Sequence, residues 1–323
     1  MHAMVADASG RLCWQPVPDP VPAAGEVLIE VAAAGVNRAD LLQAAGRYAP
    51  PPGSSTIMGL EVSGTIRELG DGVIGWSVGD QVCALLAGGG YAEKVNVPAT
   101  QVLPLPIGVS LNDSAALPEV AATVWSNVVM TANLTAGQLI LLHGGASGIG
   151  THAIQVCKTL GARVAVTAGS EEKLALCREL GADITINYRQ EDFVARINAE
   201  GGANVILDIM GAAYLDRNID ALAADGRVVI IGMQGGAKAE FNIGKLLAKR
   251  AGVIGTTLRA RPVEGFSGKA AVISQVHQQV WPMIADERVR PIIGAQFPIQ
   301  QAHQAHELLA AGTVSGKILL RID

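Results

Sequence analysis

The residues best suited to chemistry form a glycine-rich turn in the middle of the chain, His143-Gly144-Gly145-Ala146-Ser147-Gly148-Ile149-Gly150. An apolar run over 139–142 precedes this turn, and an apolar-periodic helix follows it directly. The order strand, tight turn, helix places backbone N–H groups and a helix N-terminus where a phosphate binds. The turn therefore predicts a dinucleotide site.

The turn follows the G-x-G-x-x-G pattern with one substitution. Gly145 and Gly150 occupy the outer positions, where glycine permits the tight turn and lets the helix pack on the strand. Ser147 occupies the middle position, where glycine normally lets the backbone approach a pyrophosphate. Gly148 follows, and a serine hydroxyl can donate to phosphate, so we expect the turn to bind. The cofactor-binding residues predicted here are Gly145, Ala146, Ser147, Gly148 and Ile149.

The end of the next predicted strand favours NADP over NAD. An NAD site places Asp or Glu about 20 residues after the turn, where the carboxylate holds the ribose 2′-hydroxyl. This chain has the small residues 167–170 at that point, and Glu171 and Glu172 come one or two positions late. Acidic residues in a first helical turn complement the macrodipole, which gives these two carboxylates another role.

Three further side chains are candidates for the same end of the cofactor. Ser170 is placed to cap the helix that follows and also to reach the cofactor. Lys173 can reach a 2′-phosphate, with a solvated helix-face lysine as the structural alternative. Tyr188 ends the third predicted strand, where its hydroxyl can lean on the same phosphate. We expect NADPH as the cofactor.

A second loop belongs with this site. Gly232, Met233 and Gln234 follow the fifth predicted strand. Ligands of open α/β sheets bind at the carboxyl ends of the strands, so this loop is predicted to line the cofactor. A plain flexible loop is the alternative.

The elements that must position these residues alternate between strand and helix from about Leu139 to Leu258. After the first strand and helix, strands are predicted over 163–167, 183–188, 203–210, 227–232 and 252–258. Helices are predicted over 171–180, 192–199, 214–223 and 243–250. This alternation predicts an α/β fold, a Rossmann doubly wound parallel sheet of six strands.

The flanking segments have a different pattern. Strands predicted over 27–33, 62–69, 81–86 and 92–97, with frequent Gly and Pro between them, indicate a mainly β domain. Helices over 269–285 and 299–311 and strands over 292–297 and 317–321 form a tail that we expect to return to that domain. The predicted division is a discontinuous domain of 1–118 and 260–323 and a nucleotide-binding domain of 119–259.

Composition excludes several classes of protein. The 323 residues suffice for about two domains, and the net charge of −5 with no Lys/Arg run beyond two residues argues against nucleic acid. No apolar run reaches the length of a membrane helix, so we expect no membrane partner and a cytoplasmic location. Four cysteines without a C-x-x-C pair predict neither a disulfide framework nor a zinc knuckle, and Cys157 and Cys177 are expected to be buried thiols.

Several motifs together resemble the medium-chain dehydrogenase/reductases, and within them the zinc-independent NADPH:quinone oxidoreductase branch. The resemblance covers nearly the whole chain, and the ordered combination is specific although single motifs are loose. The motifs are Gly35-Val36-Asn37-Arg38-Ala39-Asp40, Gly46-Arg47-Tyr48, Gly59-Leu60-Glu61-Val62-Ser63-Gly64, Val78-Gly79-Asp80-Gln81-Val82, Ala121-Ala122-Thr123-Val124-Trp125, the glycine turn and Gly316-Lys317-Ile318.

The resemblance implies a GroES-like, mainly β catalytic domain made from both chain ends, a Rossmann domain, and a homodimer. Zinc-dependent members carry Cys where this chain has Val36 and His where it has Leu60, so ligands of catalytic zinc are missing. His303 and His306 share a predicted helix face at i, i+3 without a third ligand. We expect a solvated helix there and no metal site.

The activity implied by the resemblance is metal-free hydride transfer from NADPH to quinones or other carbonyl-conjugated acceptors. The resemblance implies that Asn37 points at the nicotinamide or the substrate and that Tyr48 lines the pocket and donates to the acceptor oxygen. Thr123 is expected at the nicotinamide end, and Leu258 is included among the cofactor-binding residues. The sequence alone also fits Asn37 as a turn residue and Tyr48 as a half-buried aromatic.

Alternatives remain open. An enoyl-thioester or 2-enal reductase would use the same scaffold, although no basic cluster for a CoA phosphate is evident. A short-chain dehydrogenase carries a similar glycine loop near its N-terminus followed by Tyr-x-x-x-Lys. Here the loop lies at residue 145 and none of the four tyrosines has Lys four residues later, which argues against this class. A non-enzymatic, crystallin-like NADP-binding protein has the same fold.

Overall fold

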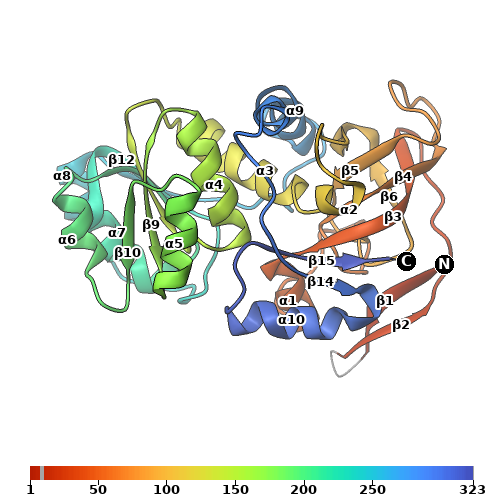
Figure 1. Ribbon diagram of the computed structural model, residues 1–323, viewed down its shortest axis with the longest axis horizontal. Coiled ribbons are helices and arrows are strands. Elements are labelled where there is room, and N and C mark those ends of the chain that lie inside the picture. Colours follow the sequence, from red (N-terminus) through yellow and green to blue (C-terminus); the bar gives the residue numbers. More distant parts are fainter. Residues whose placement is uncertain (8–10, 323) are drawn as a thin grey trace. The chain divides into compact units, whose positions relative to one another are not determined.

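The computed structural model describes residues 1–7 and 11–322 and divides into two compact units. Unit 1 comprises Met1–Ala122, Leu258–Glu287 and Pro291–Asp323. Unit 2 comprises Thr123–Thr257 and Arg288–Arg290. Figure 1 shows both chain ends in unit 1 and the middle of the chain, in green and cyan, in unit 2. No helix of the described residues is long and apolar enough to cross a bilayer.

Unit 2 is built on a parallel sheet of six strands in the order β10-β9-β8-β11-β12-β13. The order reverses between β8 and β11, which is the switch point where ligands bind in doubly wound sheets. The predicted Rossmann sheet is confirmed. Its strands are β8 (Leu139–His143), β9 (Arg163–Ala168), β10 (Ile184–Asn187), β11 (Ala203–Asp208), β12 (Leu222–Ile230) and β13 (Gly252–Gly255).

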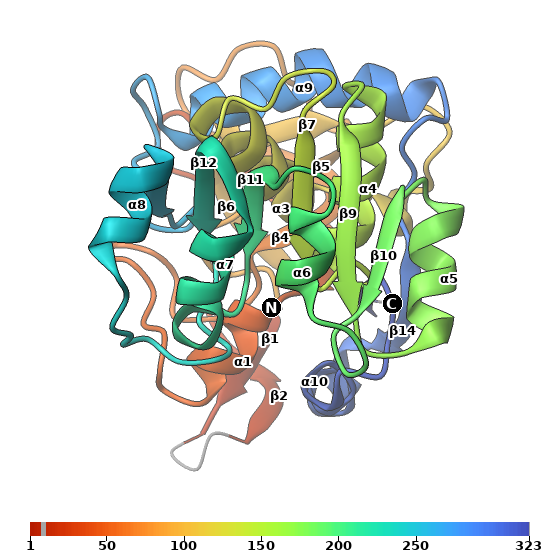
Figure 2. The same ribbon diagram turned by 90° about the vertical axis from the view of Figure 1, so that its left-hand side faces the viewer.

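Helices cover both faces of this sheet because their apolar sides pack on its buried strands. Figure 2 shows α6 and α7 in front of the sheet and α4 behind it. Phe193, fully buried, packs with Ile186, Ile206 and Val228 in the core beneath α6. The helices are α4 (Gly148–Thr159), α5 (Glu171–Glu179), α6 (Phe193–Asn198), α7 (Leu215–Ala221) and α8 (Ile243–Lys249), with a 3-10 turn at Gly211–Tyr214 and a π-helix at Trp125–Thr131.

One predicted boundary in unit 2 is wrong. The helix predicted over 214–223 ends at Ala221, and β12 begins at Leu222 rather than at Arg227. Leu222 pairs with Ala203, the register then shifts, and pairing resumes between Val205 and Arg227. The turn-like residues between them, including Asp225 at φ 63°, form a bulge within the strand instead of a loop before it.

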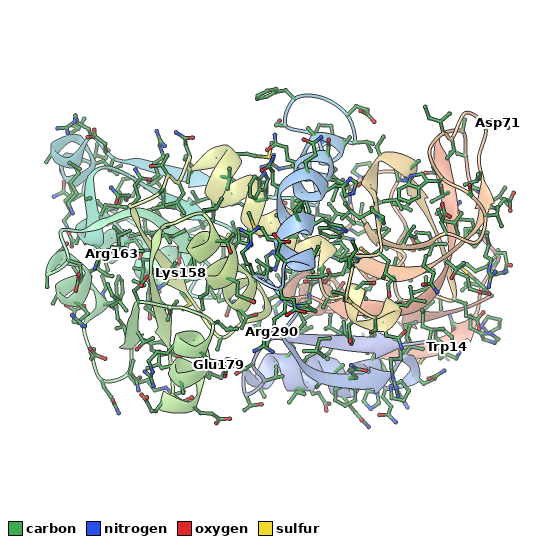
Figure 3. All side chains as sticks on the ribbon, turned by 45° about the horizontal axis from the view of Figure 1, so that its top comes forward. Trp14, Asp71, Lys158, Arg163, Glu179 and Arg290 are labelled. Carbon is green, nitrogen blue, oxygen red and sulfur yellow. The ribbon has the colours of Figure 1, made fainter. Side chains whose placement is uncertain are left out.

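The short segment 288–290 is fastened to unit 2 by paired hydrogen bonds. The Gln155 amide donates to the Arg290 carbonyl at 3.0 Å and accepts from the Arg290 N–H at 2.9 Å. The Arg290 guanidinium also lies 2.9 Å from the Glu179 carboxylate, and Figure 3 shows these two side chains next to each other. These contacts explain why three residues of the tail belong to unit 2.

Unit 1 contains a mainly antiparallel sheet of seven strands along the path β14-β15-β3-β4-β5-β7, with β6 paired to β3. The C-terminal strand β15 pairs with β3, so the tail returns to the sheet of the N-terminal segment as expected. The strands are β3 (Glu26–Val36), β4 (Glu61–Leu69), β5 (Gln81–Leu85), β6 (Lys94–Pro98), β7 (Val102–Pro104), β14 (Ile293–Pro298) and β15 (Lys317–Arg321), beside a hairpin of β1 (His2–Ala6) and β2 (Leu12–Pro16).

Short helices and two longer ones surround this sheet. In Figure 1, α10 lies along β14 and β15 beside α1. Its buried Ala302 and Ala305 join the core formed by Val27, Ile29 and Ile318. The helices are α1 (Arg38–Ala44), α2 (Leu111–Ser114), α9 (Lys269–Ala285) and α10 (Ala302–Ala311), with 3-10 turns at Ala99–Gln101 and Ile299–Gln301. The helix α3 (Pro118–Val124) begins in unit 1 and ends in unit 2.

A buried ion pair ties the last strand to the middle of unit 1. The fully buried Glu61 carboxylate accepts from Lys317 at 2.5 Å, from the Asn37 amide at 2.9 Å and from the Glu119 backbone N–H at 2.8 Å. Gly35 makes room for it, because a Cβ there would lie 2.3 Å from Glu61 Oε1. The carboxylate thus joins β3, β4, β15 and the start of α3.

The expected solvated face of α10 is wrong at one histidine. His303 is exposed, whereas His306 is 9% exposed and its Nε2 lies 3.1 Å from the hydroxyl of the fully buried Tyr91. With 3.6 residues per turn, residues three apart differ by about 60° around the helix axis, so His306 can lie on the buried side of α10 while His303 faces solvent. No group of three or more His, Cys, Asp or Glu side chains among the described residues is arranged to hold a metal.

Four histidines differ sharply in their environment. Burial lowers the pKa of His143, His152 and His306 to about 4, while His303 is exposed. His152, on α4, is 3% exposed and neither ring nitrogen has a hydrogen-bond partner. Cys157 and Cys177 are buried thiols, as expected, and burial raises the pKa of the Cys157 thiol to about 12.

Lys317→Met is expected to lower the free energy of unfolding by about 3–5 kcal/mol, because it leaves the buried Glu61 carboxylate unpaired. Adding Glu61→Gln is expected to recover part of the loss. The control is Arg67→Met, which removes an exposed partner of Glu30 in the same sheet and is expected to cost about 1 kcal/mol or less. Urea denaturation followed by circular dichroism measures all three, and equal losses in the two single variants would contradict this assignment.

His152→Leu is expected to stabilise the protein more at pH 5 than at pH 7.5, by about 2 kcal/mol. The folded-state pKa of His152 lies near 4, below the ordinary 6.5, so the unfolded chain binds the extra proton and stability falls as pH drops through this window. Leucine removes that loss. Urea denaturation at both pH values measures the change in the free energy of unfolding, and the exposed His303→Leu serves as the control. An effect of His152→Leu that does not depend on pH refutes the prediction.

Candidate functional site

The glycine turn begins at the end of β8 and closes within three residues. Gly144 takes φ +74°, the Ser147 N–H donates to the Gly144 carbonyl at 2.9 Å, and the Gly145 N–H donates to the Thr167 carbonyl of β9 at 3.0 Å. The positive φ therefore falls on Gly144, whereas the sequence pattern assigned the tight turn to Gly145. The pattern fixes the number of glycines, but the backbone decides which one takes the left-handed conformation.

Gly145 and Gly150 are needed for close packing. A Cβ at Gly145 would lie 2.7 Å from Val166 Cβ and 3.0 Å from Cys177 Sγ. A Cβ at Gly150 would lie 2.4 Å from the Gly144 carbonyl oxygen. The turn is thus pressed between β9 and the first turn of α4, as the pattern predicts for Gly150.

Ser147 is the N-cap of α4. Its Oγ accepts from the Gly150 N–H at 3.1 Å, which leaves the hydroxyl hydrogen available to a phosphate. The first N–H groups of a helix have no acceptor within the helix, so those of Gly148 and Ile149 point toward the same anion position. Ala146 lies buried within the turn. The five residues predicted here are together at one helix N-terminus.

A buried polar network supports the turn from below. His143 Nδ1 lies 3.0 Å from Thr167 Oγ1, and His143 Nε2 lies 2.8 Å from Asn218 Oδ1. Burial lowers the pKa of His143 to about 4, so the imidazole is neutral near pH 7. Because Asn218 Oδ1 only accepts, Nε2 carries the hydrogen and Nδ1 accepts from Thr167. The sequence places His143 before the turn but does not indicate either of these partners.

Three predicted residues gather where β9 and β10 end. Ser170 caps α5 and accepts from the Lys173 N–H at 3.4 Å, so Lys173 lies in the first turn of that helix. A Cβ at Gly169 would lie 2.6 Å from the Tyr188 hydroxyl and 3.3 Å from Arg189 Nε. Both side chains therefore lie over Gly169, next to the cap.

Arg189 was missed in the sequence. It is exposed and its N–H donates to the Asn187 side chain at 3.1 Å. Its position directly after Tyr188, at the predicted end of a strand, could have suggested it. Neighbouring residues of a strand point to opposite faces, however, so the pattern does not predict that Arg189 joins Tyr188. The chain turns at Asn187, and both side chains reach the same glycine. This end of the site holds two cations, Lys173 and Arg189.

The loop after β12 is packed against the end of β11. The Gln234 N–H donates to the Ile209 carbonyl at 3.1 Å, and a Cβ at Gly232 would lie 2.9 Å from that same oxygen. Met233 is 63% exposed. These contacts argue against a plain flexible loop and place Gly232–Gln234 at the carboxyl edge of the sheet.

Asn37 is held firmly in unit 1. It is the N-cap of α1, its N–H donates to the buried Asp40 carboxylate at 2.8 Å, and its amide oxygen accepts from Lys317 at 2.8 Å. Its amide nitrogen donates to Glu61 at 2.9 Å. Both ends of the amide thus have protein partners. Burial raises the pKa of Asp40 to about 6, because desolvation outweighs its two backbone hydrogen bonds.

Tyr48 is half-buried and has an arginine beside its ring. The Arg259 guanidinium carbon lies 5.2 Å from the ring centroid, within the range of a cation–π contact. Arg259 donates to the Ala87 carbonyl and to the Gln43 amide oxygen, each at 2.7 Å. The sequence indicates Tyr48 but gives no signal for Arg259, because the loop around Arg259 shows no periodicity.

The remaining predicted residues fall in different units. Thr123 begins unit 2, is 6% exposed, and its carbonyl accepts from the Asn127 amide at 2.8 Å. Leu258 is 7% exposed and begins a segment of unit 1. The turn, the residues around Gly169 and the 232–234 loop are in unit 2, whereas Asn37, Tyr48 and Leu258 are in unit 1.

Two family models match the chain. One described as "Alcohol dehydrogenase GroES-like domain" matches residues 23–107, and one described as "Zinc-binding dehydrogenase" matches residues 148–272. The first match lies within unit 1, and the second contains the glycine turn from Gly148 onward.

Curated relatives and solved structures agree with these matches. Quinone oxidoreductase of Rattus norvegicus is 30% identical over 93% of this chain and 90% of its own length. Quinone oxidoreductase 1 of Escherichia coli K12 is also 30% identical, over 93% of this chain and 92% of its own length. The solved quinone oxidoreductase of Thermus thermophilus is 29% identical, with a TM-score of 0.83 and full coverage of both chains.

Fold, motif order and relatives therefore agree. The chain belongs to the medium-chain dehydrogenase/reductase superfamily, in its quinone oxidoreductase branch, and is an oxidoreductase of that family.

Proposed function

We propose that the protein is an NADPH-dependent reductase that transfers hydride to quinones or other carbonyl-conjugated acceptors without a metal. The observation that carries the proposal is the set of polar and cationic residues where β9 and β10 end: Tyr188 and Arg189 lie over Gly169, and Ser170 and Lys173 lie at the N-cap and in the first turn of α5. Lys173 and Arg189 supply two positive charges, and Ser170 and Tyr188 supply hydroxyls, at the strand end where an NAD site needs a carboxylate.

The residues of unit 2 fit a phosphorylated dinucleotide. The unpaired N–H groups at the start of α4 suit the pyrophosphate, and the small residues at the turn leave its backbone open to approach. Lys173 and Arg189 suit the extra charge of a 2′-phosphate, because guanidinium and ammonium groups form strong hydrogen bonds with phosphate oxygens. The solved Thermus thermophilus relative includes a complex with NADPH, which supports the same cofactor here.

The residues of unit 1 support chemistry without zinc. Val36 and Leu60 are apolar and buried at the positions where zinc-dependent members carry Cys and His. The neighbouring Glu61 carboxylate is bonded to Lys317, Asn37 and the Glu119 N–H. A zinc ion needs thiolate, imidazole or carboxylate donors, and this set offers only an occupied carboxylate.

The chain's own residues would bind and orient the reactants. The bound nicotinamide supplies the hydride. Tyr48 would border the acceptor and donate from its hydroxyl to the acceptor oxygen, and Asn37, whose amide is held by Lys317 and Glu61, would face the acceptor. Reaction depends on this positioning and on exclusion of water, since quinones and conjugated carbonyls are already electrophilic. The proton that completes the reduction comes from solvent.

A panel of acceptors tests the proposed activity. NADPH oxidation, followed by its absorbance, is expected to accelerate with 1,4-naphthoquinone or a short 2-enal, to exceed the rate with NADH, and to persist after treatment with a chelator. Turnover of crotonyl thioesters alone would identify an enoyl-thioester reductase instead. Loss of activity with the chelator would overturn the metal-free reaction, and tight NADPH binding without turnover of any acceptor would leave a crystallin-like binding protein.

Lys173→Ala and Arg189→Ala are each expected to raise the dissociation constant of NADPH about tenfold and that of NADH less than twofold, because only NADPH carries the 2′-phosphate. Titration of the cofactors against intrinsic fluorescence measures both constants. Lys158→Ala, in the last turn of α4 and away from the glycine turn, is the matched control. An equal loss for both cofactors rules out the 2′-phosphate role.

A further inference from the structure

Arg259 is a buried arginine with one unsatisfied side. It is 4% exposed, and its Nε and Nη2 donate to the Ala87 carbonyl and the Gln43 amide oxygen. Its Nη1 is enclosed and has no hydrogen-bond partner. Both of its acceptors are neutral, and none of the ion pairs in the described part of the chain includes it. A guanidinium buried in this way is costly unless a ligand pairs with it.

The orientation of this guanidinium is fixed by two rigid supports. Gln43, on α1, is itself held by donating to the Thr56 carbonyl at 2.8 Å. Ala87 precedes Gly88, where a Cβ would lie 2.6 Å from the Ser55 carbonyl oxygen, so the backbone there is tightly packed. Because Nε and Nη2 are both held by these contacts, the planar guanidinium cannot rotate, and the orientation of Nη1 is fixed. Such positioning is typical of binding sites rather than of surface arginines.

Charged groups of both signs lie near Arg259: burial lowers the pKa of its guanidinium, whereas the negative charges of Asp40 and Glu119 raise it. Lys269, on α9, is also buried at 4% exposure and donates to the Arg261 carbonyl at 2.9 Å. Desolvation lowers the pKa of Lys269, and the charge of Arg259 adds to that effect against the opposing charge of Glu119. An arginine remains protonated in proteins whatever its burial. The ligand that suits Nη1 is therefore an oxygen that carries or develops negative charge.

The neighbouring Tyr48 indicates that this oxygen belongs to the acceptor molecule. Its ring lies beside the guanidinium, with 5.2 Å between the ring centroid and Cζ. We propose that Arg259 binds the carbonyl oxygen of the acceptor through Nη1 and is a specificity-determining residue that favours acceptors with negative charge on oxygen. This inference rests on the proposed function, because Tyr48 is placed at the acceptor there.

The proposed reduction needs only NADPH as the reductant and water as the source of the proton. A hydride supplied by bound NADPH would form a new C–H bond at the β-carbon of a conjugated carbonyl; the π pair of the C=C bond would then form a double bond between the α-carbon and the carbonyl carbon, and the π pair of the C=O bond would move to oxygen to give an enolate. The hydride donor would leave as NADP⁺, and a proton from water would complete the product. A quinone accepts the same hydride and proton to become a hydroquinone. In both cases negative charge develops on the oxygen that Nη1 would hold, and a preorganised donor stabilises it.

The test compares Arg259→Gln with Arg261→Gln, a matched control two residues away whose guanidinium donates to the Ser267 carbonyl. The probe is 2-hydroxy-1,4-naphthoquinone, which is an anion at neutral pH, and 1,4-naphthoquinone is its neutral counterpart. Calorimetric titration of the NADP⁺-bound protein gives both dissociation constants. Arg259→Gln is expected to weaken binding of the anion at least tenfold and of the neutral quinone less than threefold, with NADP⁺ binding unchanged. Arg261→Gln is expected to change none of these.

A second variant separates charge from geometry and from misfolding. Arg259→Lys keeps the charge and is expected to retain more anion binding than Arg259→Gln, with a lower kcat for quinone reduction because the fork is lost. If both Arg259 variants bind the anion as the wild type does, or if anion and neutral quinone weaken equally, the proposal is overturned. Failure of the wild type to reduce any acceptor removes the proposed function, whereas selective loss of anion binding still shows that Arg259 is the anion site.

Discussion

The buried Glu61 carboxylate is the interaction on which the architecture of unit 1 depends. A carboxylate removed from water must be fully paired, and its partners come from Asn37 after β3, Glu119 near the start of α3, and Lys317 on the last strand. These residues are far apart in the sequence. The sheet of unit 1 can therefore satisfy this charge only when the C-terminal tail pairs with β3.

Buried polar groups also fix both parts of the proposed site. Beneath the glycine turn, neutral His143 bridges Thr167 and Asn218 and so links β8, β9 and α7. Beside Tyr48, Gln43 and Ala87 hold two edges of Arg259. In the first case the network supports the strands that carry the turn, and in the second case it fixes the orientation of the guanidinium itself. Such support lowers the entropy lost on binding, which is a common reason for buried polar networks at sites.

Most strands and helices of unit 2 could be predicted because the sequence patterns that indicate them span only a few neighbouring residues. Each strand and helix has its own apolar period, and the glycine turn joins two neighbouring elements. Prediction failed where a distant pairing changed the outcome. The bulge in β12 arises because Leu222 pairs with Ala203 before the turn residues, and His306 is buried because Tyr91 lies opposite it.

The sequence by itself determined the doubly wound sheet, the phosphate-binding turn, the missing carboxylate after β9, and the absence of Cys and His at positions 36 and 60. Those features depend on residue type and on short spacing. Only the tertiary structure decided that Arg189 joins Tyr188 over Gly169, that Lys317 neutralises Glu61, and that Arg259 keeps one unpaired N–H beside Tyr48. The reason is that hydrogen bonds and ion pairs between distant segments follow from packing, which no local period encodes.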